Sequence, residues 1–318
     1  MSLHFASPTR VGGVRAVLIA LVAVAAAVTV ALLVAVQPPA SAVDGKHAAV
    51  YYQTQYDGDR YVSPLELTAN GAPVTDVIVG AVHLNSPTEV HLNDDPPDAA
   101  KYEQMWADLR SLQDGGVQVL GMVGGAAHGS FQRLDTEFDT YYPLLKDFLS
   151  TRGLDGVDLN VEEEMSQQGI QRLITALRAD FGPDFLITMG PVASALSGGG
   201  NLSGFDYDQL YREVGGEIAW FNAQFYNGWG DASSTADFDA IVERGVIPAE
   251  RISVTALTNQ GNGGSGYVDV EGLRATLSAL QAEHPNFAGV TGWEYFNSQP
   301  ATGSDPWQWL IDVTGAWS

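Results

Sequence analysis

The residues best suited to chemistry lie in one short stretch, residues 154–162, where polar and apolar side chains alternate. As a strand, this stretch places Asp158, Asn160 and Glu162 on one face and apolar residues on the other. Same-face neighbours lie about 6.6 Å apart, so one ligand across the strand end could contact Asn160 and Glu162 together. Aspartate is disfavoured in strands, and neighbouring carboxylates repel each other unless something uses or neutralises them. The pattern therefore favours a functional site over an ordinary solvated strand face.

Eight short apolar segments from residue 48 onward predict the strands that must position this site. They span residues 48–53, 76–82, 117–123, 153–161, 185–189, 218–226, 251–256 and 288–295. Amphipathic helical patterns follow several of them, at residues 102–113, 140–152, 167–181, 235–244 and 270–283. Such alternation is typical of parallel βα units, and eight units in about 250 residues predict a closed (β/α)8 TIM barrel. A doubly wound open sheet is the alternative, but the glycines at 121–125 lack phosphate-loop spacing.

The first 42 residues have the order of an export signal. Arg10 and Arg15 precede an apolar run at residues 16–36, and residues 40–42 (Ala-Ser-Ala) offer a small-residue cleavage site. The run is longer than most signal peptides need, and about 20 residues can span a bilayer, so an uncleaved signal anchor is the alternative. Either way, we expect residues 43–318 to form one domain outside the cytoplasm, as a secreted or anchored protein.

The composition limits the classes of partner. The formal net charge is −23, and such a surface repels nucleic acid and anionic membranes, so a neutral ligand is expected. There is no cysteine, so the fold must be stable without disulfides. His83, His91 and His128 lie on different predicted loops without ligand spacing, and we expect neither a metal nor a cofactor.

Residues 155–162 resemble the signature of family 18 glycoside hydrolases, the chitinases and endo-β-N-acetylglucosaminidases. That signature reads Asp-Gly-x-Asp-x-Asp-x-Glu at the end of the fourth barrel strand. Asp155, Gly156, Asp158 and Glu162 match it, whereas Asn160 stands where the family normally has aspartate.

Two further stretches carry the same resemblance. Residues 224–227 (Gln-Phe-Tyr-Asn) look like the sixth-strand end of smaller family members. Residues 122–125 are similar to the family's Ser-x-Gly-Gly strand, with Met122 in place of serine. The segment between the seventh and eighth strands holds one loop and one helix pattern, so we expect no α+β insertion there and a more open groove.

The resemblance implies the catalytic roles. Glu162 is the candidate general acid, and the substrate's own 2-acetamido oxygen attacks the anomeric carbon, so a second carboxylate is not required. Asn160 would orient the acetamido N–H without adding negative charge, which predicts slower hydrolysis or more transfer to a sugar acceptor. Tyr226 would hold the acetamido carbonyl. Asp158 and the deeper Asp155 would orient Asn160 and bias the proton on Glu162.

Binding residues are expected where the barrel strands end, because active sites of such barrels lie at the carboxyl ends of the strands. Aromatic rings stack on sugars while their polar atoms bond to hydroxyl groups. The predicted substrate contacts are Gln224, Trp293, Tyr52, Met189 and Asn227.

The implied activity is that of a retaining endo-glycosidase that cleaves β-1,4-linked N-acetylglucosamine, in chitin oligomers or in the chitobiose core of N-glycans. We expect a monomer. The alternative is a catalytically weak, lectin-like carbohydrate-binding protein on the same scaffold, which Asn160 favours and Glu162 opposes. On this reasoning Glu162→Gln should abolish turnover, and Asn160→Asp should keep or raise it.

Overall fold

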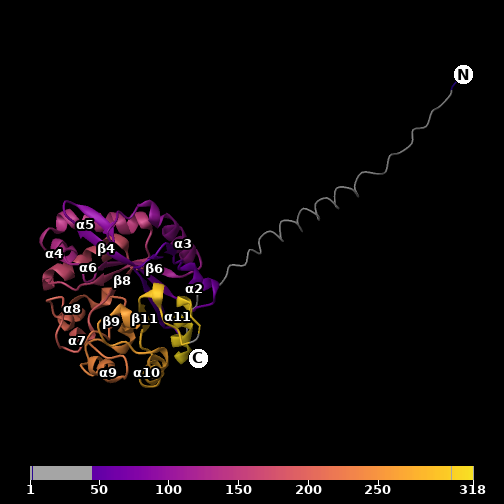
Figure 1. The fold of residues 1–318 in the computed structure, drawn as a ribbon. Helices are drawn as coiled ribbons and strands as arrows, with labels where there is room; N and C mark the ends of the chain where they lie inside the picture. The colour runs from indigo at the N-terminus through magenta and orange to yellow at the C-terminus, as the bar shows by residue number, and fades with distance from the viewer. Residues whose placement is uncertain (1, 3–44, 302, 318) are drawn as a thin grey trace. The chain divides into compact units, whose positions relative to one another are not determined.

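Eight parallel strands form a closed barrel in the computed structural model, which describes Ser2, residues 45–301 and residues 303–317 (Figure 1). The strands are β1 (His47–Tyr52), β4 (Asp76–Asn85), β6 (Gln118–Gly124), β7 (Gly156–Asn160), β8 (Leu186–Met189), β9 (Phe221–Gln224), β10 (Ile252–Leu257) and β11 (Gly289–Trp293). Closure occurs at β1, where Val50 lies opposite Gly292 of β11 and Val77 of β4. The predicted TIM barrel is confirmed. The export signal predicted for residues 1–42 lies outside the described residues, Ser2 apart.

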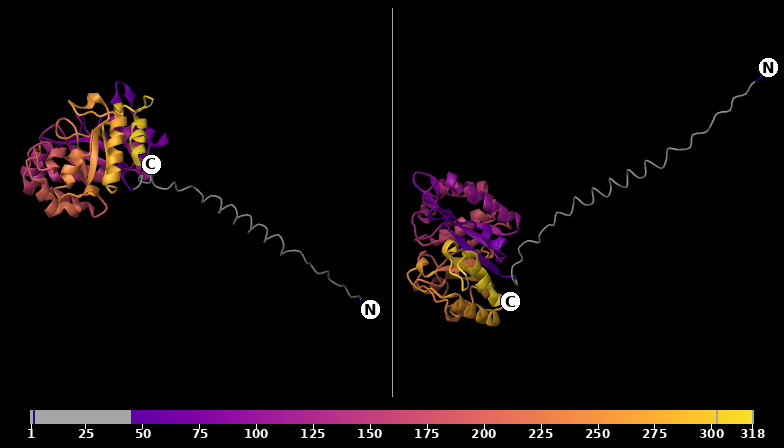
Figure 2. Two further views of the ribbon diagram at one scale, coloured as in Figure 1. Left: turned by 90° about the horizontal axis from the view of Figure 1, so that it is seen from below. Right: turned by 45° about the vertical axis from the view of Figure 1, so that its right-hand side comes forward.

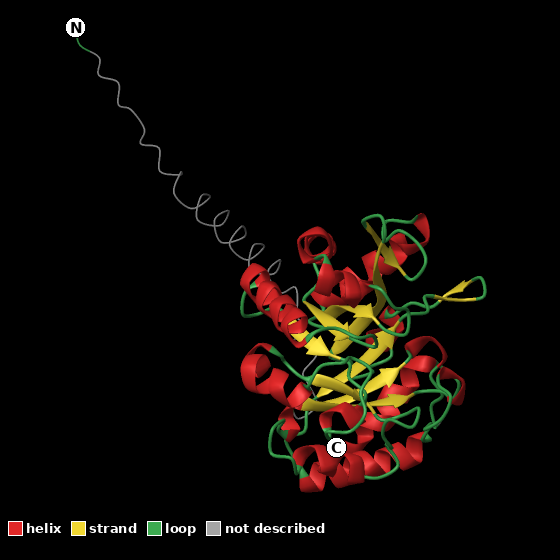
Figure 3. Cartoon of the chain, turned by 90° about the vertical axis from the view of Figure 1, so that its left-hand side faces the viewer, coloured by secondary structure: helices red, strands yellow, loops and turns green. Residues whose placement is uncertain are grey.

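Helices surround the barrel and cover its outer face (Figures 2 and 3). They are α2 (Leu65–Ala69), α3 (Glu103–Asp114), α4 (Ser130–Thr136), α5 (Phe138–Arg152), α6 (Gln167–Phe181), α7 (Ala193–Leu196), α8 (Tyr207–Val214), α9 (Ala236–Val242), α10 (Val270–Glu283) and α11 (Pro306–Thr314). In α6, buried side chains recur at Ile170, Leu173 and Leu177, which places one apolar face against the strands. Ser166 caps this helix by accepting a hydrogen bond from the Gly169 amide at 3.0 Å. Helix α6 begins and ends where the periodicity predicts.

The connections differ in part from the expectation. Strand β5 (Glu89–Leu92) pairs antiparallel with the end of β4, and β2 (Tyr56–Asp57) pairs with β3 (Arg60–Tyr61), neither of which the sequence pattern predicts. Between β10 and β11 lie one 3-10 turn (Gln260–Asn262) and α10, so the expected lack of an α+β insertion is confirmed. No helix in the described part of the chain is both long and apolar enough to cross a membrane.

The barrel interior divides into two halves. Strands β1, β4 and β6 contribute an apolar cluster of Tyr51, Ile78, Ala81, Leu120 and Met122, which is separate from the larger core under the helices. The remaining strands contribute polar side chains that hydrogen-bond to one another, namely Asp158, Thr188, Asn222, Ser253 and Thr291. The two groups of strands meet between β6 and β7, directly beneath the predicted site, and again between β11 and β1.

Candidate active site

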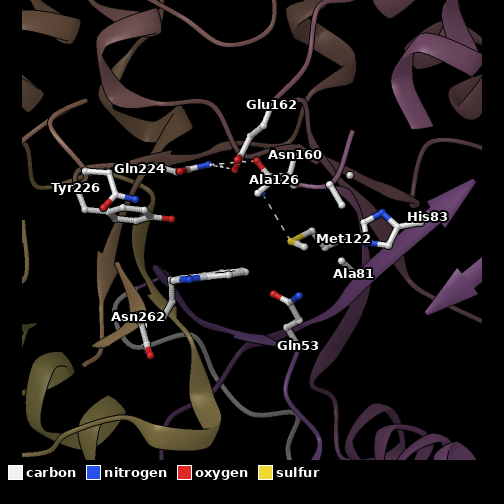
Figure 4. Close-up of a pocket in the computed structure, with 15 residues that line it drawn as sticks. Gln53, Ala81, His83, Met122, Ala126, Asn160, Glu162, Gln224, Tyr226 and Asn262 are labelled. Carbon is white, nitrogen blue, oxygen red and sulfur yellow. Dashed lines mark hydrogen bonds between the residues drawn. The ribbon is translucent and has the colours of Figure 1, made fainter. Parts of the chain in front are cut away.

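A cavity of about 390 Å³ lies at the carboxyl ends of the barrel strands (Figure 4). Its polar lining comes from most of the strand ends, and includes Gln53, His83, Asn160, Glu162, Gln224, Tyr226, Asn227 and Asn262. Its apolar lining includes Ala81, Met122, Ala126 and Trp293. The cavity therefore contains six of the predicted site residues: Glu162, Asn160, Tyr226, Gln224, Asn227 and Trp293.

Gln224 joins the two central residues of the site. Its Nε2 donates to Glu162 Oε1 at 3.0 Å and to Asn160 Oδ1 at 3.2 Å, and it also lies 2.9 Å from the Gly190 carbonyl. An amide nitrogen carries two hydrogens, so these three acceptors share them. Glu162 and Asn160 thus lie on one face of the β7 strand end, as the alternation predicts, and a side chain from β9 fixes both.

The Asn160 side chain is held at both ends of its amide. Its oxygen accepts from Gln224, and its nitrogen faces the Met122 sulfur at 3.8 Å. Only 4 % of Asn160 is exposed. Asp158, expected to orient Asn160, makes neither of these contacts. The orientation is therefore set by side chains from β6, which pairs with β7, and from β9, which lies beyond β8.

Asp158 is completely buried beneath the cavity. Its Oδ1 accepts from the Thr188 hydroxyl at 2.6 Å and from Asn222 Nδ2 at 3.0 Å, and its Oδ2 accepts from the Tyr51 hydroxyl at 2.9 Å. Burial raises the pKa of the Asp158 carboxyl, and the hydrogen bonds from these three donors act in the opposite direction. Asp158 is thus a fixed acidic group behind the site, and its hydrogen-bond donors come from three other strands, β1, β8 and β9.

Asp155 lies at the other end of β7, and its expected role is corrected. Its Oδ2 accepts from the Val119 amide and from Gln113 Nε2, both at 2.8 Å. These partners are at the start of β6 and near the end of α3, on the side of the barrel opposite the cavity. Asp155 therefore stabilises the amino-terminal end of the barrel and does not orient Asn160.

Tyr226 and Trp293 contribute the aromatic part of the cavity. Burial, reinforced by the charges of Glu162 and Asp158, raises the pKa of the Tyr226 hydroxyl well above its ordinary value. This hydroxyl consequently stays protonated and can donate a hydrogen bond into the cavity, toward which Figure 4 shows it pointing. Trp293 packs edge to face on Tyr51, with ring centroids 5.2 Å apart.

Asn227 also shapes the cavity wall. It adopts a positive φ of 57°, a conformation that asparagine tolerates better than most residues. Its Oδ1 accepts from the amides of Gly264 at 2.8 Å and Ser265 at 3.2 Å. It therefore fixes the loop after β10 against the loop after β9.

Tyr52 and Met189, both expected to contact substrate, lie outside the cavity. The Tyr52 hydroxyl donates to the Val62 carbonyl at 2.7 Å, and both side chains belong to the core under the helices. Successive side chains of a strand point to opposite faces, so the inward residues are their neighbours, Tyr51 and Thr188. Each strand is buried on both faces, and the sequence alone did not indicate which face is inward.

The predicted site set lacked four residues that contact Asp158 or Asn160, namely Tyr51, Met122, Thr188 and Asn222. It also lacked the polar lining residues Gln53, His83 and Asn262. Two of the first four residues, Met122 and Thr188, lie directly opposite Asp158 on the two strands that pair with β7. Aligning the predicted neighbouring strands with β7 would have identified them. Tyr51 and Asn222 come from strands that are not adjacent to β7, so only the closed barrel brings them to Asp158.

One group of side chains could hold a metal ion, away from the cavity. Among the residues with described positions, ligand atoms of Asp239, Glu283 and His284 lie within 4.8 Å of one another. Asp239 Oδ1 already pairs with His284 Nε2 at 2.8 Å, which links α9 to the end of α10.

Known proteins match both the sequence and the fold. Residues 47–260 match the family model described as Glycosyl hydrolases family 18. A fungal endo-β-N-acetylglucosaminidase of that family is 44 % identical with a TM-score of 0.81, over 84 % of this chain and 96 % of the other. Chitinase ChiC from Aspergillus fumigatus is 49 % identical with a TM-score of 0.79, over 85 % of this chain and 98 % of the other.

A curated relative is matched over a shorter region. Chitinase 2 of Rhizopus oligosporus is 27 % identical over 207 residues, which are 59 % of this chain and 36 % of that protein. This chain therefore spans well under half of that relative's length. The family model alone covers about two thirds of the chain, including the whole of β7 and the Glu162 site. The chain belongs to glycosyl hydrolases family 18.

Proposed function

We propose that this protein is a retaining endo-glycosidase that hydrolyses β-1,4-linked N-acetylglucosamine, with the substrate's own acetamido group as the nucleophile. One observation carries the proposal: Glu162 is the only carboxylate among the described residues that line the cavity. Asp158, the nearest acid on the same strand face, is buried and engaged by three donors. An ordinary retaining enzyme needs a second carboxylate about 5–5.5 Å from the acid, whereas substrate-assisted catalysis does not.

The proposed reaction has two steps. Glu162 gives its proton to the glycosidic oxygen while the acetamido carbonyl oxygen attacks the anomeric carbon, so the glycosidic bond breaks and an oxazolinium ring forms. Water then attacks the anomeric carbon, opens the ring and returns a proton to Glu162. Tyr226 would donate a hydrogen bond to the acetamido oxygen, and Asn160 Oδ1 would accept one from the acetamido N–H. Two displacements at one carbon retain the β configuration.

Cleavage within a chain is supported by the space on both sides of the acid. Glu162 and Ala126 line the main cavity and also an adjoining cavity of about 560 Å³. Sugars on the non-reducing side of the bond would occupy the main cavity, and the leaving part would extend into the second one. The similarity to a chitinase and to an endo-β-N-acetylglucosaminidase supports such a substrate.

Asn160 supports a second candidate, a lectin-like protein with weak catalysis. An amide can bind the acetamido group but cannot offset the positive charge that develops on the sugar ring, and losing one such electrostatic group typically costs about 10²–10³-fold in rate. For either function we propose export through residues 1–42 and a monomeric state.

The test is a side-by-side digestion of chitin oligomers and a high-mannose glycopeptide, with mass detection of products and NMR of the first anomer formed. The proposal expects β-anomeric products from at least one substrate and none from Glu162→Gln. Saturable binding without turnover in the wild-type protein would support the lectin-like alternative. Equal turnover by the wild type and Glu162→Gln would refute the acid assignment.

A further inference from the structure

We infer that Met122 is a positioning residue for Asn160, and that its thioether makes position 160 a site for an amide rather than for a carboxylate. The inference rests on the proposed function in one respect, because that proposal assigns Asn160 to the acetamido group of the substrate.

Met122 is held firmly against Asn160. It lies on β6 opposite Asp158, it is 1 % exposed, and its sulfur is 3.8 Å from Asn160 Nδ2 (Figure 4). Gly80 makes room for its methyl group, because a Cβ atom there would lie only 2.9 Å from Met122 Cε, and at Gly125 a Cβ atom would be in ordinary contact with that methyl group at 3.5 Å. The thioether therefore occupies a fitted space beside the amide.

The contacts at the two ends of the Asn160 amide agree on a single orientation. Gln224 presents a donor to the oxygen, and a thioether sulfur is an acceptor without any hydrogen to donate. Reversing the amide would set two NH2 groups against each other and would set the oxygen against the sulfur. The carbonyl oxygen is thereby kept on the Gln224 side, where it retains a second lone pair for an acetamido N–H.

A carboxylate would not fit the same surroundings. One oxygen could accept from Gln224, but the other would face the sulfur with no donor, in a position that is 4 % exposed. The titratable groups around this position are Asp158 on β7, Glu162 just after β7, Tyr51 from β1, His83 from β4 and Tyr226 after β9. Two of them are acids, and the described cavity lining contains no lysine or arginine.

The carboxyl introduced by Asn160→Asp should consequently keep its proton to a higher pH than an ordinary aspartate. While protonated, it would present its O–H to the sulfur and its carbonyl to Gln224, and would imitate the native amide. This changes the expectation from sequence: Asn160→Asp alone should gain little activity in acid and near-neutral solution. Adding Met122→Ser supplies a hydroxyl donor and should allow the carboxylate to form.

The experiment is a double-mutant cycle with Asn160→Asp and Met122→Ser, read as pH profiles of kcat/KM on a chromogenic chitobioside. Asn160→Asp alone should stay within about threefold of wild type at pH 5–6 and show an added ionisation. Met122→Ser in that background should move the midpoint of this ionisation down by about one pH unit, which is a tenfold change in the acid's dissociation constant. An identical midpoint in both backgrounds would overturn the inference.

A second readout requires no turnover, so it separates failure of this inference from failure of the proposed function. A buried acid with a raised pKa destabilises the folded state as pH rises from its unfolded pKa, about 3.9, to its folded pKa. The loss of Tm in Asn160→Asp relative to wild type should thus be small at pH 4 and should grow toward pH 7. Adding Met122→Ser should make the loss of Tm increase less between pH 4 and pH 7. If the loss increases equally with and without Met122→Ser, the role of Met122 is contradicted.

Two variants control for packing. Met122→Leu keeps nearly the same volume without the sulfur acceptor, so it should leave Tm within a few degrees while lowering kcat two- to fivefold. Met189→Leu changes a methionine of the core under the helices and should alter neither kcat nor the pH profile. Equal kcat in Met122→Leu and wild type would show that the sulfur does not position Asn160.

Discussion

The two halves of the barrel interior differ in how they hold the site. On β7 to β11, the interior polar side chains hydrogen-bond to one another. Asp158 accepts three hydrogen bonds, from Thr188, from Asn222 and, across the barrel, from Tyr51. The cluster of Tyr51, Ile78, Ala81, Leu120 and Met122 on β1, β4 and β6 is hydrocarbon and one thioether, apart from the Tyr51 hydroxyl. His47 Nδ1 and Oδ2 of the buried Asp76, 2.8 Å apart, pair at the start of β1 and β4, at the opposite end of the barrel from the cavity. The proposed catalytic residues Glu162, Asn160 and Tyr226 extend from the polar half and line the cavity together with Met122 of the apolar half.

The difference separates two kinds of stabilisation. The hydrogen bonds that Asp158 accepts in the polar half depend on the charge of its carboxyl group, so their contribution to stability should change with pH. Packing within the apolar cluster of the other half depends on volume and contact area, neither of which titrates. Variants in the two halves should therefore differ in pH dependence as well as in size of effect.

The largest effect is expected at the end of the polar half. Glu162→Gln keeps the shape of the side chain and its ability to accept from Gln224, but it cannot give a proton to the leaving oxygen. Turnover of a chitin oligomer should fall by at least about 10²–10⁴-fold, the usual contribution of a general acid. Calorimetry should still detect oligomer binding. The exposed Glu103→Gln on α3 is the matched control, and a comparable loss there would discredit the assignment.

Tyr226→Phe should have the next largest effect. The variant removes one hydroxyl that stays protonated and points into the cavity, and loss of a single such donor costs about 10²-fold or more in kcat. Steady-state kinetics should show the loss in kcat more than in KM. Tyr211→Phe on α8 serves as the control, and a change confined to KM would indicate that Tyr226 only binds substrate.

Tyr51→Phe tests the contact that crosses between the halves. It removes a donor from Asp158, so the folded-state pKa of that carboxyl, already raised by burial, should rise further. The free energy of unfolding should fall by about 1.5–3 kcal/mol at pH 7, and by less in acid, where the carboxyl is protonated in both proteins.

Tyr52→Phe is the matched control for that experiment, because the Tyr52 hydroxyl donates to the uncharged Val62 carbonyl in the core under the helices. Urea denaturation should show that this variant lowers the free energy of unfolding by about 1 kcal/mol at every pH. If the two variants show the same pH dependence, the charge of Asp158 is not what distinguishes the halves.

The smallest effect is expected in the apolar half. Ile78→Val removes one buried methylene and should lower the free energy of unfolding by about 0.5–1.5 kcal/mol, independently of pH. Activity should be unchanged. Urea unfolding at pH 5 and pH 8 would check this, and a clear pH dependence would remove the distinction between the halves.

Much of the barrel could be predicted from the sequence, because strand and helix periodicities are local properties of the chain. The predicted bounds of the strands lie within a few residues of the observed ones. The predicted bounds of α6 and α10 are the same as the observed bounds. The short pairing of β5 with β4 was missed, because residues 89–92 are too few and too polar to carry a strand pattern. The same local logic placed Asn160 and Glu162 together on one face.

The sequence by itself determined the relative order of side chains along β7, because alternation within a strand requires no knowledge of its neighbours. Only the tertiary structure decided that Tyr51, and not Tyr52, faces the site, and that Gln224 and Met122 hold Asn160 from β9 and β6. These partners lie 64 and 38 residues away from Asn160 along the chain. Their meeting depends on the register and closure of the whole barrel, which no single segment encodes.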